Sequence, residues 1–271
     1  MKKLIKYNIE ILTLLFFVSL QILIFLLFIS SINFILIYIF IIDLIVIVSL
    51  IDGTKKFKEN VKEKKISKND KNIYFYNQLI IPLVLFLSTE VFLIINRFNI
   101  YFSELTLIIT VVLFFTSLKY FEAYFEVFEF SEKAHFTINA VKLFIFFILI
   151  YSLFEVSSIL YISQYIQSAF VLLISFALIL MIMQRNKIYS LKFILYSFLI
   201  SLFISLISLL ENIYLQNVLL TTFSISLIFY FFENILHHKF HNTLTREIII
   251  QYILIILILF LLIKGVVGLS L

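Results

Sequence analysis

The segment ENILHHKFHN, residues 233–242, holds the chain's densest group of side chains that can bind a metal ion. If a helix runs through it, Glu233, His237 and His241 fall at positions i, i+4 and i+8 and share one face. Two imidazoles one turn apart can hold one metal ion, and a carboxylate one turn earlier can complete three protein ligands. The other interpretation is a hydrated helix end, where the helix dipole favours histidine.

Glu126 and His135 can add to such a metal site. Glu126 lies in an acidic stripe with helical spacing within residues 119–136, and His135 ends that segment. The expected topology places both residues on the same side of the membrane as Glu233 and His237. The segment HHKFH is similar to a single histidine box of the membrane fatty-acid desaturases. Their further boxes are absent from this chain of four histidines, so we carry over no role.

Two carboxylic acids lie inside apolar runs. Asp43 is near the middle of IFIIDLIVIV, where a carboxylate costs about 3 kcal/mol on insertion scales. We therefore expect Asp43 to face the bundle interior, where it pairs or stays protonated, and it is a candidate for proton or cation coordination. Glu90 lies in the next apolar run, in the third of it that is expected to be nearest the outside of the cell. The alternatives are a structural hydrogen bond for Asp43 and, for Glu90, hydration or an ion pair with Arg97.

Composition identifies the elements that position these residues. Of the 271 residues, 63% are hydrophobic and 14% are charged, and the mean hydropathy is +1.15. Apolar runs of roughly 17 to 25 residues match the length needed to cross a bilayer. We predict an all-α, polytopic integral membrane helix bundle with about nine transmembrane helices, although eight or ten remain open. The predicted spans are residues 9–29, 32–51, 75–95, 104–121, 137–156, 166–183, 189–210, 217–235 and 247–264.

The distribution of basic residues predicts the orientation. With nine spans, all of the 21 basic residues except Arg97 and Lys264 fall on the side of the N-terminus. Because basic residues near span ends stay on the cytoplasmic side, we expect a cytoplasmic N-terminus in a multi-pass protein of the cell membrane. We predict one transmembrane domain, residues 1–271, with a lysine-rich cytoplasmic loop at 52–72 and an uncleaved first span.

We attribute the net charge of +5 to contact with membrane lipids. The lysines lie beside membrane segments, where anionic lipid headgroups at the cytoplasmic face are the expected counter-charge. No nucleic-acid-binding module is recognisable, so we expect the lipid bilayer as the partner and no nucleic acid. A membrane-protein partner is compatible with this sequence but is not identified by it. The chain has no cysteine, which excludes disulfides and thiolate ligands.

Ser197, Ser201, Ser205 and Ser208 recur at helical spacing in the seventh predicted span. They predict a small-residue face along which another helix packs closely.

For function, the leading hypothesis is a noncatalytic or transport-class membrane protein: a small-solute or lipid carrier, or a membrane-complex subunit, with Asp43 as its internal polar residue and no cofactor favoured. The alternative is a membrane enzyme with a divalent metal held by His and Glu at the cytoplasmic face.

Overall fold

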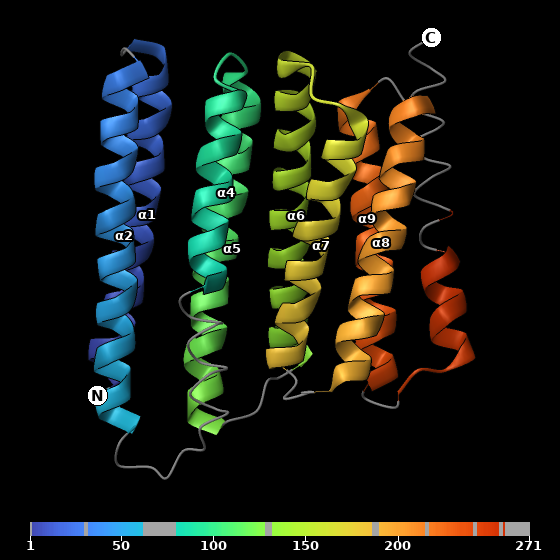
Figure 1. Cartoon of the computed structure of the whole chain (residues 1–271). Coiled ribbons are helices and arrows are strands. Elements are labelled where there is room, and N and C mark those ends of the chain that lie inside the picture. Colours follow the sequence, from blue (N-terminus) through green and yellow to red (C-terminus); the bar gives the residue numbers. More distant parts are fainter. Residues whose placement is uncertain are drawn as a thin grey trace. The chain divides into compact units, whose positions relative to one another are not determined.

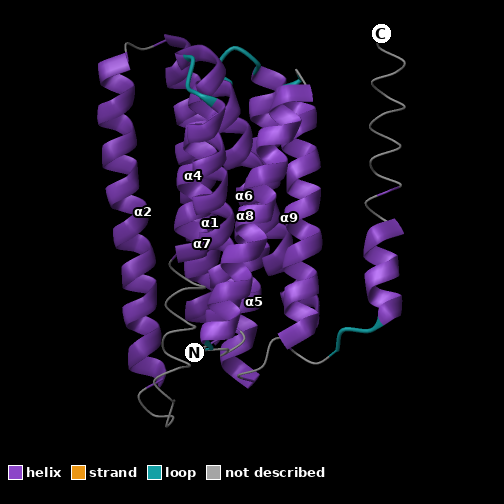
Figure 2. Ribbon diagram, turned by 45° about the vertical axis from the view of Figure 1, so that its right-hand side comes forward, coloured by secondary structure: helices purple, strands orange, loops and turns teal. Residues whose placement is uncertain are grey.

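The computed structural model of the chain describes residues 2–29, 32–61, 80–127, 132–185, 190–214, 217–240, 243–254 and 257. Within these ranges the regular elements are helices and none is a strand (Figure 2). Seven of the described helices are long and apolar enough to cross a membrane. The predicted all-α, multi-pass membrane fold is therefore confirmed.

The labelled helices follow one another through short connections wherever the structure describes the connection (Figure 1). They are α1 (Lys2–Ile29), α2 (Ile32–Val61), α4 (Ile81–Ile95), α5 (Ile100–Val127), α6 (Glu132–Leu160), α7 (Gln164–Arg185), α8 (Leu191–Tyr214) and α9 (Val218–Phe240). A further helical stretch covers residues 246–254. At 1.5 Å per residue, α4 is about 22 Å long, shorter than the seven candidate spans. The third and ninth predicted spans both extend into residues outside the described ranges.

Several helices continue beyond their predicted apolar runs. Helix α1 begins at Lys2, and α2 continues to Val61, so the first ten residues of the predicted loop 52–72 are helical. Helix α5 likewise runs through Glu126 to Val127. Lysine and glutamate are good helix formers, which explains why a helix continues after its apolar run has ended.

Polar side chains mark the beginnings of four helices. The side-chain oxygen of Asn99 accepts a hydrogen bond from the backbone N–H of Phe102 at the start of α5. Ser190 caps α8, Asn217 caps α9, and Thr245 caps the 246–254 helix in the same way. These caps satisfy backbone donors that have no partner in the first helical turn.

The chain divides into two compact units, Met1–Ile148 and Leu149–Leu271, and α6 crosses the boundary. The first unit contains α1, α2, α4 and α5, and the second contains α7, α8 and α9. The arrangement of these units in a single transmembrane domain stays a prediction.

An aromatic cluster holds α1, α4 and α5 of the first unit together. Phe16 of α1 stacks on Phe114 of α5 with ring centroids 4.0 Å apart, and it meets Phe86 of α4 edge-on at 4.9 Å. All three rings are buried. Beside them, the hydroxyl oxygens of Thr89 and Thr110 lie 3.2 Å apart and join α4 to α5. Helix α2 packs against α1 (Figure 1) and makes a smaller contact with α4.

In the second unit, the serine face of α8 packs against α7. Ser197, Ser201, Ser205 and Ser208 are all buried. The hydroxyl of Ser205 donates a hydrogen bond to the backbone oxygen of Ser168 in α7, at 2.7 Å. Small side chains let the two backbones approach closely, so this face has the packing role that its spacing predicts. Elsewhere in the chain, large apolar side chains such as Phe34 and Phe40 of α2 and Leu195 of α8 are more than half exposed, as expected beside lipid.

We expect the Ser201→Leu substitution to destabilise the protein in detergent by about 1 to 3 kcal/mol, because a larger side chain overpacks the contact between α7 and α8. Ser201→Ala keeps the small volume and should have little effect. Leu202→Phe adds volume at the adjacent, exposed position and is the matched control. Thermal unfolding, monitored by size-exclusion chromatography, gives the midpoint of each variant. A wild-type midpoint for Ser201→Leu would contradict the tight packing of this face.

Candidate functional site

The structure brings together the two carboxylic acids predicted to lie within the membrane. Asp43 lies on α2 and Glu90 on α4, and their carboxyl groups lie close enough to interact with each other. Glu90 is only 3% exposed, and Asp43 is partly buried. Two ionised carboxylates are both hydrogen-bond acceptors, so a hydrogen bond between them forms only when one of them carries a proton. The pair thus places two acidic side chains together between two helices of the first unit.

Each member of the pair also keeps a buried oxygen without a hydrogen-bond partner in the described structure. These atoms are Oδ1 of Asp43 and Oε1 of Glu90. Leaving an acceptor buried and unpaired costs free energy, and native proteins usually satisfy such atoms with protein groups, ordered water or an ion. The two oxygens can therefore accept a hydrogen bond from water or an ammonium group, or contact a cation.

A tyrosine and the aromatic cluster lie near the pair. The hydroxyl of Tyr38 on α2 donates a hydrogen bond to the backbone oxygen of Ser19 on α1, at 2.8 Å, and Tyr38 lies close enough to Glu90 to interact with it electrostatically. Phe86 lies one turn before Glu90 on α4 and packs on α1, so Glu90 lies on the side of α4 that packs on that helix. Tyr38 is not among the site residues predicted from the sequence. The sequence feature that could have identified it is a tyrosine inside an apolar span, where the hydroxyl group needs a hydrogen-bond partner.

The histidine segment at the end of α9 is only partly described. Helix α9 does continue past Leu236, so Glu233 and His237 lie one turn apart on it, and Glu233 is buried. The rings of His237 and His238 are 5.7 Å apart, and Nδ1 of His238 lies 2.9 Å from the hydroxyl oxygen of Thr243. The ring of Tyr252 packs on His238 at 6.2 Å. His238 is thereby held against the chain that follows α9.

The predicted metal site therefore stays a prediction. Among the residues that the structure describes, no group of three His, Asp or Glu side chains is arranged to hold a metal ion. His241 and the side chains of Glu126 and His135 lie outside the described part. Glu126 and His135 also belong to the first unit, whereas Glu233 and His237 belong to the second.

Comparison with protein-family models, with curated proteins and with solved structures finds no match for this chain.

Proposed function

We propose that this multi-pass membrane protein is a carrier for a small solute or lipid, and that the Asp43–Glu90 pair binds and releases a proton during transport. The observation that supports this proposal is the close approach of the two carboxyl groups across α2 and α4. Ionisable groups within a membrane span are costly, and in transport proteins they commonly form proton relays or ion sites.

The protonation state of the pair controls the contact between α2 and α4. With one shared proton, the two side chains bridge the helices. Without it, two negative charges about 4 Å apart repel each other by roughly 4 kcal/mol at an effective dielectric constant of about 20. The pair must then separate, or water or a cation must enter between the two carboxylates. Their unpaired oxygens, Asp43 Oδ1 and Glu90 Oε1, are available to that water or cation.

Helix α2 is the element best suited to move. The span within α2 is 17% buried, whereas the other six candidate spans are 33% to 44% buried. A helix that buries less of its surface loses fewer packing contacts when it shifts. Proton loss from the pair is therefore proposed to move α2 relative to α4, which gives the coupling between proton binding and conformation that a carrier needs.

The proposal places the protein in the cell membrane, with its N-terminus and residues 52–72 on the cytoplasmic side. There the lysines of this segment are expected to contact anionic lipid headgroups. The basic residues beside the spans support this orientation.

Proton-coupled transport can be measured in liposomes that contain the purified protein and a trapped pH-sensitive dye. Amino acids, sugars and organic cations are added in turn, and we expect one of these solute classes to cause a dye response with the wild type. In Asp43→Asn and Glu90→Gln the response should fall to that of protein-free liposomes, because an amide keeps the shape of the side chain but cannot release the proton. Glu10→Gln, at an exposed carboxylate of α1, is the control and should keep the response.

Two outcomes would contradict the proposal. One is proton movement of wild-type size in both Asp43→Asn and Glu90→Gln. The other, which contradicts a small-solute carrier, is no proton movement in the wild type with any of the three solute classes.

A further inference from the structure

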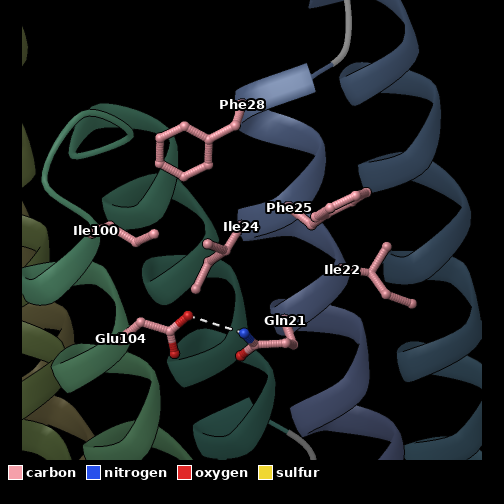
Figure 3. Close-up of a pocket in the computed structure, with 7 residues that line it drawn as sticks. All are labelled: Gln21, Ile22, Ile24, Phe25, Phe28, Ile100 and Glu104. Atoms are coloured by element: carbon pink, nitrogen blue, oxygen red, sulfur yellow. Dashed lines mark hydrogen bonds between the residues drawn. The ribbon is translucent and has the colours of Figure 1, made fainter.

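A recess of about 370 Å³ lies between α1 and α5 in the first unit. It is lined by Gln21, Ile22, Ile24, Phe25, Phe28, Ile100 and Glu104. Figure 3 shows the side chains of Gln21 and Glu104 meeting across the two helices, with Ile24, Phe28 and Ile100 above them in the view. The recess thus combines apolar walls with one polar pair.

The recess opens on a surface that faces lipid in a membrane. The four lining residues Ile22, Phe25, Phe28 and Ile100 are between 42% and 64% exposed. In a chain that spans a bilayer, large apolar side chains with this exposure contact acyl chains. Membrane lipids can therefore reach the recess.

The polar pair can discriminate among those lipids by their headgroups. The side-chain nitrogen of Gln21, Nε2, donates a hydrogen bond to Oε1 of Glu104, at 2.9 Å. This bond leaves the second carboxylate oxygen of Glu104 and the amide oxygen of Gln21 as further acceptors. Glu104 is the one charged residue among the seven that line the recess. A group that bears a positive charge and N–H donors complements this arrangement, and a phosphate or a second carboxylate does not.

Glu104 lies close enough to a helix end to meet a lipid headgroup. It is four residues after Ile100, where α5 begins, which is about 6 Å along the helix axis. The candidate span in α5 begins at the same residue, so the carboxylate lies near one boundary of the hydrocarbon layer. An ammonium headgroup can reach this depth while its acyl chains lie against the phenylalanines of the recess.

We propose that the recess between α1 and α5 binds a membrane lipid with a primary ammonium headgroup, which donates hydrogen bonds to Glu104 while its acyl chains pack on Phe25 and Phe28. This inference does not depend on the proposed transport function, because it concerns different residues and requires no proton transfer.

Lipid binding can be compared by native mass spectrometry of delipidated, full-length protein in detergent. The probes are phosphatidylethanolamine, phosphatidylcholine and phosphatidylglycerol with identical acyl chains. Phosphatidylethanolamine has a primary ammonium group, whereas the quaternary nitrogen of phosphatidylcholine has no N–H donor and phosphatidylglycerol is anionic. We expect phosphatidylethanolamine to bind about tenfold more tightly than phosphatidylcholine, the size of effect that one charge-assisted hydrogen bond gives.

Two substitutions separate the headgroup contact from the apolar contact. Glu104→Gln should abolish the preference for phosphatidylethanolamine, whereas Phe25→Ala should weaken the binding of all three lipids and keep the preference. Glu10→Gln removes an exposed carboxylate elsewhere on α1 and should behave as the wild type. Phe25 is exposed, so its truncation should leave the fold intact, as a wild-type thermal midpoint will verify.

Three results would overturn the inference. They are equal affinities of the wild type for phosphatidylethanolamine and phosphatidylcholine, tighter binding of phosphatidylglycerol than of phosphatidylethanolamine, and a preference that survives in Glu104→Gln.

Discussion

Replacing Asp43 with asparagine, or Glu90 with glutamine, is expected to remove most of the pH dependence of the protein's thermal stability. The proposed shared proton stabilises the folded state at low pH, and this stabilisation is lost as the pH rises. The loss can reach about 4 kcal/mol when both groups become ionised. An amide at either position leaves one carboxyl group at most, so two negative charges can no longer meet.

The measurement is the thermal midpoint in detergent, taken in buffers from mildly acidic to mildly alkaline. Glu104→Gln is the matched control, because Glu104 is also a partly buried carboxylate within a span but does not belong to the pair. Its midpoint should fall with rising pH as the wild-type midpoint does. If Asp43→Asn and Glu90→Gln keep the full wild-type pH dependence, the pair does not share a proton.

The second large effect is expected for Phe16→Ala. Phe16 is 1% exposed and contacts both Phe86 and Phe114, so truncation leaves a cavity where α1, α4 and α5 meet. Truncating a buried phenylalanine typically costs 3 to 5 kcal/mol, and we expect about that loss here. Because Phe86 is one turn from Glu90 on α4, the cavity should also loosen the carboxyl pair.

Phe17→Ala is the control for Phe16→Ala. It removes the same side chain one residue later, but Phe17 is 39% exposed and lies on another face of α1. Thermal unfolding in detergent should show little change for Phe17→Ala and a large decrease for Phe16→Ala. Equal effects of the two substitutions would mean that the aromatic cluster does not hold the first unit together.

The membrane class and the approximate positions of the spans could be predicted from the sequence, because crossing hydrocarbon requires long apolar helices. The ends of the helices could be predicted less well from the sequence. Helix α2 continues to Val61 because lysine and glutamate form helices well, although hydropathy marks this region as a loop. The serine face of α8 was predictable because four buried positions share one helical face.

The pairing of Asp43 with Glu90 could not be predicted from the sequence. Their positions in apolar spans indicate that each needs a partner, but the identity of the partner depends on how α2 and α4 pack and rotate against each other. Tyr38 was missed for the same reason, since its hydrogen bond reaches a backbone oxygen of another helix. The glutamine partner of Glu104 likewise lies 83 positions away in the sequence.

Infrared spectroscopy of the purified protein tests the central claim most directly, because it detects the C=O stretch of a protonated carboxylic acid. The spectrum of the Asp43→Asn/Glu90→Gln double variant is subtracted from that of the wild type at neutral pH. We predict a positive carboxylic-acid band in this difference. When the double-variant spectrum is instead subtracted from the spectrum of Glu90→Gln, the band should lie at a different frequency. A difference that contains only ionised carboxylate bands would contradict a proton shared between Asp43 and Glu90.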